Sequence, residues 1–235
     1  MDKIALFSDI HGNFQALDAI IKTLEKQGIK DIYCLGDILS IGPSSRECID
    51  LILNKKIPMV LGNHEIAYLF DDYQQIVEHE REYYYWMATL LNQEIMNHLK
   101  DMPLDISLLL KDYRIYLSHY AYDKQTKDHY PPNNKYREEE LLELYKDINA
   151  DYIFVGHEHT GQILKTSKFN YINLESSGCR DNEMTFYYLV SLDNNNQIKV
   201  KKKEIEYDRK RFEEVMNQTE FPKKQFLQKV FFGID

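Results

Sequence analysis

Five short polar stretches constrain this chain more than any other feature, because each follows an apolar run typical of a buried β-strand. They are Asp9-Ile10-His11-Gly12-Asn13, Gly36-Asp37, Gly62-Asn63-His64-Glu65, Ser118-His119 and Gly156-His157-Glu158-His159. Side chains at the carboxyl ends of neighbouring strands meet at one edge of a sheet. Carboxylate, amide and imidazole groups gathered there favour two metal ions of hard or intermediate character. The pattern therefore indicates a dinuclear metal site of the kind that hydrolases use.

Two of these stretches place possible ligands two residues apart. In extended backbone, alternate side chains share a face, so we expect Asp9 and His11 to face one site while Ile10 turns into the core. The same reasoning applies to His157 and His159 around Glu158. A single histidine is more often a core or surface residue, but five of the eight histidines follow such apolar runs, and this favours a site.

Length and composition bound the remaining possibilities. A chain of 235 residues can bury one substantial core, so we expect a single domain over residues 1–235. The net charge of −9 argues against a nucleic-acid partner, whose backbone demands clustered Lys and Arg. The sequence shows neither a signal peptide nor an apolar run that could span a bilayer, so we expect a cytoplasmic protein without a membrane contact. Three cysteines without a Cys-x-x-Cys pair are expected to be reduced thiols.

The first third of the chain reads as a right-handed βαβαβ unit. Strands are predicted over residues 3–8, 31–35 and 57–61, with helices over residues 14–27 and 44–53. From residue 65 to about 103 the pattern is helical and aromatic, and it predicts a cap of two helices.

Shorter strands dominate the second half. Two hairpins are predicted, with strands at residues 105–110, 113–118, 162–166 and 170–174, and a helix at residues 137–146 and a strand at 151–155 lie between them. Strands at residues 184–192 and 198–203 complete the sheet, and residues 206–232 are helical. The succession of strand, ligand turn and helix predicts an α/β fold, namely a four-layer αββα sandwich of two mixed sheets with a small helical cap.

With these five motifs in this order, residues 3–192 resemble the calcineurin-like metallophosphoesterases. Within that superfamily the chain is most similar to the small bacterial branch of asymmetrical diadenosine tetraphosphate hydrolases and related phosphodiesterases. The resemblance rests on Gly36-Asp37-Ile38 leading into Gly42-Pro43 and on a similar tail.

The resemblance implies two metal ions and assigns their ligands. One ion would take Asp9, His11, Asp37 and His159, and the other Asp37, Asn63, His119 and His157. Asp37 would bridge the ions and hold their spacing, while a bridging water or hydroxide would attack phosphorus. His64 would orient the phosphate and protonate the leaving oxygen, or would support Asp37 as a neighbouring partner. The ligand set favours Mn²⁺ or Fe and also admits Zn, Ni or Co.

The substrate is expected to be a small phosphorylated compound, with dinucleoside polyphosphates and other nucleotides as the leading prediction. Alternatives are a general phosphodiesterase or phosphatase and a non-catalytic protein-binding module on the same fold. Aromatic residues 83–86 would either stack on a base or simply pack. The oligomeric state is left open. The predicted substrate contacts are Asn13, Asn63, His64, Tyr122 and Lys124.

Overall fold

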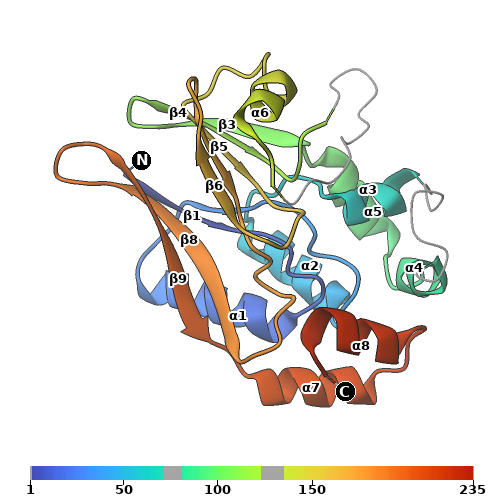
Figure 1. Ribbon diagram of the computed structural model, residues 1–235. Helices are drawn as coiled ribbons and strands as arrows, with labels where there is room; N and C mark the ends of the chain where they lie inside the picture. The colour runs from blue at the N-terminus through green and yellow to red at the C-terminus, as the bar shows by residue number, and fades with distance from the viewer. Residues whose placement is uncertain (1, 71–80, 123–134, 235) are drawn as a thin grey trace.

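The computed structural model describes residues 2–70, 81–122 and 135–234, and it folds into two β-sheets with helices on their outer faces (Figure 1). The strands are β1 (Lys3–Phe7), β2 (Ile32–Cys34), β3 (Asp105–Leu110), β4 (Tyr113–Ser118), β5 (Tyr152–Val155), β6 (Gln162–Lys165), β7 (Asn170–Asn173), β8 (Met184–Leu192) and β9 (Ile198–Glu206). The helices are α1 (Phe14–Lys26), α2 (Ser45–Lys55), α3 (Asn63–Phe70), α4 (Arg81–Ala88), α5 (Gln93–Asp101), α6 (Glu138–Leu144), α7 (Arg209–Gln218) and α8 (Lys224–Phe232).

Both sheets are mixed, as the sequence predicts. The first has the order β2-β1-β8-β9, in which β1 pairs parallel with β2 and antiparallel with β8. The second has the order β3-β4-β5-β7-β6, with a parallel centre between two antiparallel edge strands. The hairpin of β8 and β9 therefore returns to the first sheet, next to the strand that opens the chain.

Alternation of side chains along the strands builds the layers. In β1, Ile4 and Leu6 join a core between the two sheets, whereas Ala5 and Phe7 join a core under α1 and α2. In the second sheet, Phe154 faces the first sheet while the neighbouring Ile153 packs under α6. Figure 1 shows α6 on the side opposite α1 and α2. The predicted αββα sandwich is confirmed.

Two local predictions are wrong. Residues 57–61 form no regular strand, because Pro58 lacks the N–H that a ladder requires, and the segment makes only an isolated parallel bridge between Cys34 and Met59. The cap contains three described helices, α3, α4 and α5, in place of the expected two.

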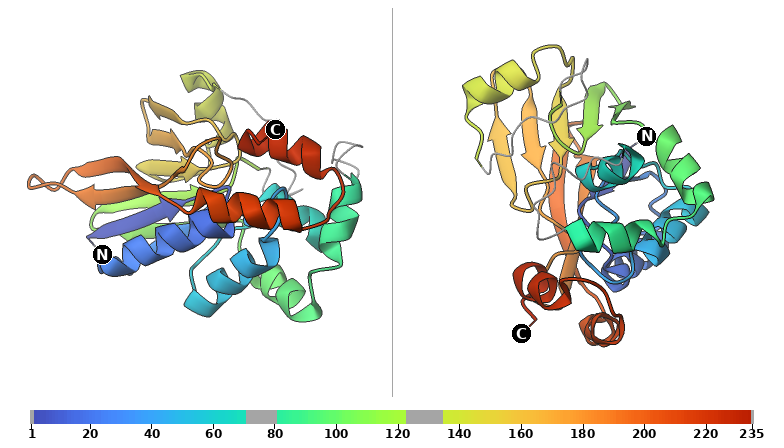
Figure 2. Two further views of the ribbon diagram at one scale, coloured as in Figure 1. Left: turned by 90° about the horizontal axis from the view of Figure 1, so that it is seen from below. Right: turned by 90° about the vertical axis from the view of Figure 1, so that its right-hand side faces the viewer.

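The cap and the C-terminal helices lie at the same end of the sandwich (Figure 2). Phe221, between α7 and α8, meets the rings of Tyr83 and Trp86 on α4 at centroid distances of 5.5 and 5.4 Å. Buried residues of the cap and of α7 and α8 belong to the same apolar cluster as those of α1 and α2. The apolar core under the first sheet therefore continues into the cap and the C-terminal helices.

All three cysteines are free thiols, as expected. Within the described residues, the helices are too short or too polar to cross a bilayer.

Candidate metal centre

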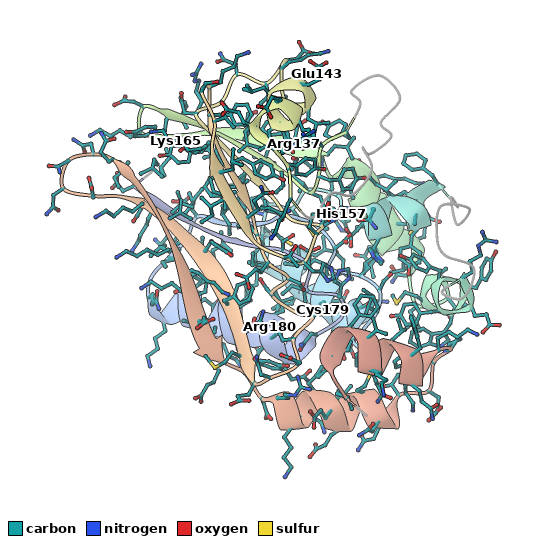
Figure 3. All side chains as sticks on the ribbon, in the orientation of Figure 1. Arg137, Glu143, His157, Lys165, Cys179 and Arg180 are labelled. Carbon is teal, nitrogen blue, oxygen red and sulfur yellow. The ribbon has the colours of Figure 1, made fainter. Side chains whose placement is uncertain are left out.

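Predicted ligands follow the ends of strands from both sheets. Asp9 and His11 come directly after β1, Asp37 lies three residues after β2, and His119 follows β4. His157 and His159 follow β5, and Asn63 begins α3. These segments converge at the end of the sandwich that the cap and α8 flank, and Figure 3 labels His157 there.

The backbone that carries these ligands is not extended. The prediction that alternating side chains of an extended strand bring Asp9 and His11, or His157 and His159, to one face is therefore wrong. Left-handed φ values are found at five ligand positions, namely Asp9 (55°), His11 (49°), Asp37 (52°), His157 (78°) and His159 (56°). Ile10 is fully buried in the core as expected, but Glu158 lines the cleft instead of turning inward. Asp and His tolerate this conformation better than most residues, and their turns aim the ligands at one point.

At one end of the site, four predicted ligands converge. The Nε2 atoms of His11 and His159 lie 2.9 Å apart, and Asp9 Oδ1 is 3.8 Å from the first and 3.5 Å from the second. Asp37 Oδ2 is 3.6 Å from His11 Nε2. The ring nitrogens and the carboxylates therefore surround one small volume.

Asp37 also reaches the second group. Its Oδ2 lies 3.1 Å from His119 Nε2, which is itself 3.1 Å from Asn63 Oδ1. His157 Nδ1 lies 2.8 Å from the same Asn63 oxygen. Asp37 is thus the carboxylate shared by the two groups, as the resemblance implies.

These spacings suit metal ions. Two donor atoms that each lie about 2.1 Å from one ion are about 3.0–3.4 Å apart at octahedral or tetrahedral angles. The hydrogen bonds of two histidines also favour metal binding. The Nδ1 atoms of His11 and His119 face the carbonyl oxygens of Leu39 and Leu35 at 3.2 and 2.6 Å. When Nδ1–H donates to a carbonyl, the Nε2 lone pair remains for a metal.

The buried carboxylates of the site create a negative potential that favours cations. Burial alone would raise the pKa of Asp9, but the hydrogen bond from His159 and the charges of His119 and His159 outweigh it and lower the pKa to about 2. Burial lowers the pKa of His119, yet the Asp37 carboxylate more than reverses this and raises it to about 9. Two buried carboxylates therefore draw cations toward them, and metal ions would supply the same charge while displacing protons from the histidines.

Comparison with known proteins fits this geometry. A family model described as calcineurin-like phosphoesterase matches residues 2–161. The chain belongs to the calcineurin-like phosphoesterases. The candidate ligand groups agree with the dinuclear metal centre that this family implies.

One curated relative matches this chain in sequence over about two thirds of its residues. A protein of Methanocaldococcus jannaschii described as uncharacterized is 33% identical over 168 residues, which cover 66% of this chain and 62% of that protein. This chain therefore matches less than two thirds of that relative's length.

Solved structures share the fold. A hypothetical protein from Pyrococcus horikoshii aligns with a TM-score of 0.79 at 20% identity, over 99% of both chains. A metallophosphoesterase from Sphaerobacter thermophilus aligns with a TM-score of 0.70 at 21% identity, over 99% of this chain and 100% of the other. Two more distant structures, at TM-scores of 0.51 and 0.53, are described as an archaeal phosphodiesterase and a candidate diadenosine tetraphosphatase.

Glu65 lies at the candidate metal centre, and the sequence assigned no role to it. Its fully buried carboxylate accepts hydrogen bonds from four backbone N–H groups, those of Asp37, Ile38, Leu39 and Gly62, at 2.9–3.0 Å. Burial, together with the nearby charge of Asp37, raises the pKa of Glu65 to about 7. Glu65 therefore fixes the turn that presents Asp37. The sequence feature that could have indicated this role is the position of Glu65 beside Asn63 and His64 in a polar stretch.

His64 points into the cluster, where it offers a ring nitrogen within 4.8 Å of ligand atoms of His11 and Asp37, although it was not predicted as a ligand. Its Nε2 lies 3.8 Å from Asp37 Oδ2, and its backbone N–H donates to Asp37 Oδ1 at 3.1 Å. Its ring meets that of His11 edge-on at a centroid distance of 4.8 Å. Burial lowers the pKa of His64, which favours the neutral ring. The structure thus allows both predicted roles, contact with the phosphate and support of Asp37.

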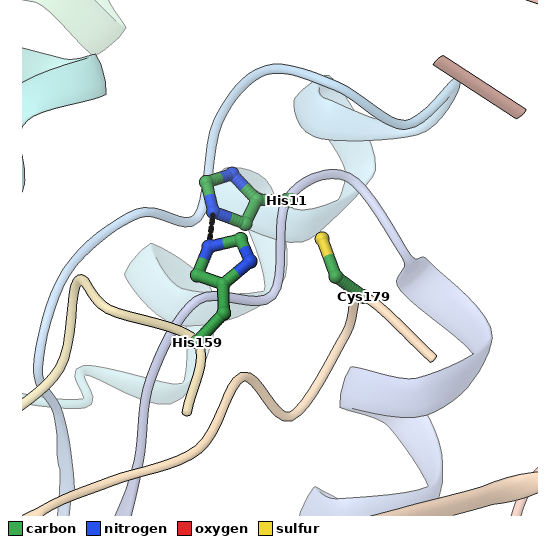
Figure 4. Close-up of side chains that lie close together, drawn as sticks. All are labelled: His11, His159 and Cys179. Atoms are coloured by element: carbon green, nitrogen blue, oxygen red, sulfur yellow. Dashed lines mark hydrogen bonds between the residues drawn. The ribbon is translucent and has the colours of Figure 1, made fainter. Parts of the chain in front are cut away.

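Cys179 lies beside the first group of ligands. Figure 4 shows its thiol directed toward the pair of His11 and His159, whose facing nitrogens are joined by the dashed line. Ligand atoms of these three residues lie within 4.8 Å of one another. Sequence reasoning treated this cysteine only as a reduced thiol, because its distance from the histidines along the chain hides the contact.

The structure places some of the predicted substrate contacts in the cleft and others away from it. Asn63 and His64 line the cleft. Asn13 is fully buried, with Oδ1 capping α1 through Ala16 N and Nδ2 donating to the carbonyl of Gly178, so its placement gives no support to a substrate contact. Tyr122 is half-buried and donates its hydroxyl to Asp105. Lys124 lies outside the described residues.

Three of the four aromatic residues at positions 83–86 pack within the protein, whereas Tyr85 is 57% exposed. Tyr83 and Tyr84 are 2% and 3% exposed, and the ring of Trp86 lies against that of Phe221 in a tilted arrangement. Base stacking by these three residues is therefore not supported. The aromatic residue that lines the cleft is Phe231 of α8, whose ring centroid lies 6.2 Å from that of His159.

Proposed function

We propose that this chain hydrolyses phosphodiester bonds in small nucleotide-like substrates, using two metal ions held by the ligands predicted above. The observation that carries the proposal is the convergence of seven donor side chains whose neighbouring donor atoms lie 2.8–3.8 Å apart, near the spacing of donors that share an ion, with His64 directed at the same point. The spacing of these donors supports the assignment of Asp37 as the bridging ligand.

Bound ions would activate a water molecule for attack and would stabilise charge on the phosphoryl oxygens. The chain's own residues would supply the rest. Asp9 and Asp37 hold negative charge in a buried setting, and the carbonyl contacts of His11 and His119 orient their rings. His64 Nε2 faces the place where the phosphoryl group would sit, so it would hydrogen-bond to the phosphate or protonate the leaving oxygen.

The cleft over the site suggests the size and charge of the substrate. It has a volume of about 290 Å³ and is lined by Asp37, Ile41, Asn63, His64, His157, Glu158, His159 and Phe231. Among these described lining residues there is no lysine or arginine, and Glu158 adds negative charge. Glu158 would offset part of the charge of the two bound ions, and a diester with one negative charge depends less on that attraction than a monoester dianion or a polyphosphate. Ile41 and Phe231 offer apolar walls for an organic group.

Asymmetrical hydrolysis of diadenosine tetraphosphate is the second candidate. The resemblance of residues 3–192 to that branch of the family supports it, as does the fold shared with the structure described as a candidate diadenosine tetraphosphatase. A tetraphosphate would need cations beyond the two ions, and Lys124, the sequence's candidate, lies outside the described residues.

The deciding experiment is a substrate panel assayed with Mn²⁺. It compares kcat/KM for an aryl phosphodiester, an aryl phosphomonoester and diadenosine tetraphosphate, with products resolved by chromatography. We expect the diester to be preferred by at least about tenfold, or about 1.4 kcal/mol in transition-state binding. Release of ATP and AMP at a higher kcat/KM would favour the second candidate. Failure on all three substrates, with metal bound, would reject the proposal.

A further inference from the structure

The ring of His64 is held from its far side by a tyrosine. While Nε2 faces Asp37, the opposite nitrogen, Nδ1, shares a hydrogen bond with the hydroxyl of Tyr84, which comes from α4 in the cap. The two rings are nearly parallel, with centroids 5.5 Å apart and an interplanar angle of 20°. His64 is therefore fixed between the cluster and the cap.

Tyr84 is itself rigidly placed. Its side chain is 3% exposed, and its ring stacks on Tyr68 at a centroid distance of 5.2 Å. The Tyr68 hydroxyl bonds to Ser40 Oγ at 2.6 Å, in the loop that follows Asp37. The neighbouring Tyr83 donates its hydroxyl to the Gly42 carbonyl at 2.9 Å in the same loop. The cap thus grips the loop beside the predicted bridging ligand and presents one phenol to His64.

A phenol can serve His64 in both protonation states. It accepts from the Nδ1–H of an imidazolium, and it still accepts from that Nδ1–H once Nε2 has given up its proton and the ring is neutral. The ring therefore keeps its orientation when a proton passes from Nε2 to a leaving oxygen. A carboxylate partner would in addition stabilise the imidazolium charge, which a neutral phenol does not.

We propose that Tyr84 is a positioning residue, whose hydroxyl holds the His64 imidazole so that Nε2 faces the scissile phosphoryl group. The inference rests on the proposed function of His64 at this site. It assigns part of the reaction geometry to the cap, which the family resemblance did not implicate.

The test compares Tyr84→Phe, which keeps the stacked ring and removes only the hydroxyl, with His64→Asn and the double variant. Aryl phosphodiesters with leaving phenols of decreasing acidity report proton donation, because poor leaving groups need it most. For the least acidic phenol we expect Tyr84→Phe to lower kcat/KM about 10-fold, and for 4-nitrophenol less than about 2-fold. The double variant should fall within about 2-fold of His64→Asn alone, because both changes remove one function.

Tyr83→Phe is the matched control, since it removes another buried hydroxyl from the same helix and should leave the leaving-group dependence unchanged. An equal loss for all leaving groups, or a loss that multiplies with that of His64→Asn, would overturn the proposal, because either would indicate a purely structural role.

A second readout does not depend on turnover. In nitrogen NMR spectra of the imidazole side chains, Tyr84→Phe should move the Nδ1 resonance of His64, assigned from its loss in His64→Asn, and should leave that of His119 in place. An unmoved His64 resonance would refute the contact. A wild-type protein that cleaves no ester would reject the proposed function, while the NMR result would still decide whether Tyr84 holds His64.

Discussion

Gly62 offers a sharp test of how closely the site is built around Asp37. A Cβ at this position would lie 2.1 Å from Asp37 Oδ1 and 2.6 Å from Asp37 N, whereas ordinary van der Waals contact begins at 3.4 Å. In Gly62→Ala the carboxylate or its turn must therefore move by about 1.3 Å, the shortfall between 3.4 and 2.1 Å. The turn can yield little, because Asp37 N and Gly62 N share the Glu65 carboxylate.

We expect Gly62→Ala to destabilise the fold by about 1–3 kcal/mol through overpacking. A displacement of about 1 Å at a catalytic group costs on the order of 100-fold in rate, so the larger effect should appear in kcat. Denaturant unfolding, metal content after dialysis and kcat/KM on an aryl phosphodiester measure the three consequences. Because both ions are expected to share Asp37, the content of both should fall.

Gly28→Ala is the matched control. Gly28 has a left-handed φ of 66°, but a Cβ there meets nothing within 4 Å. It should cost about 1 kcal/mol of stability through backbone strain alone and leave metal content and rate unchanged. If Gly62→Ala behaved like Gly28→Ala, with full metal content and full activity, the reasoning that ties Asp37 to this close contact would fail.

Three further predictions follow from the site. Metal analysis should show that Asp37→Asn loses bound metal, and this variant should lose nearly all turnover. His64→Asn should keep its metal and lose on the order of 100-fold in kcat. Loss of metal from His64→Asn would contradict the assignment of His64 as a residue that is not a metal ligand. Chelation should lower the unfolding temperature, and restoring Mn²⁺ at 100 times its Kd should return about 2.7 kcal/mol of stability; an unfolding curve indifferent to metal would argue against binding at this buried cluster. Phe231→Ala should raise KM for an aryl diester about 5-fold with little change in kcat, because Phe231 lines the cleft. Val230→Ala, on the exposed side of α8, should alter neither KM nor kcat. Equal effects of the two substitutions would show that the substrate does not contact the Phe231 ring.

The fold and the convergence of the predicted ligands could be anticipated from the sequence because both depend on local pattern. Apolar runs followed by Asp or His mark strand ends, and strand ends meet in space, so His119 and His159 could be grouped without knowing their angles. The reasoning failed where backbone geometry decides. Asp9 and His11 converge through left-handed turns, which a period of two does not describe. Asn13 is different, since its place just before α1 was a readable helix-cap signal.

Contacts made through the cap were beyond the sequence. Tyr84 reaches His64 only because α4 folds back over the loop after Asp37, and the run of aromatics that contains it has the composition of ordinary packing. Glu65 was visible as a charged residue in a conspicuous stretch. Its four backbone donors, however, depend on a turn that brings the peptide groups of residues 37–39 to one carboxylate.

The strained turns also explain why the site needs such support. Left-handed backbone costs a non-glycine residue about 1 kcal/mol or more, and five predicted ligands adopt it, so the ligand turns store a sum comparable to the net stability of a small domain. Hydrogen bonds offset part of this cost: His11 N donates to the Asp37 carbonyl, Asp9 N donates to the Gly36 carbonyl, and Glu65 gathers the turn around Asp37. Buried carboxylates at the same turns add repulsion that cations relieve. We therefore expect metal binding and folding to be coupled in this chain, and we expect changes at Glu65 or Gly62 to weaken both together even though neither residue is a predicted ligand.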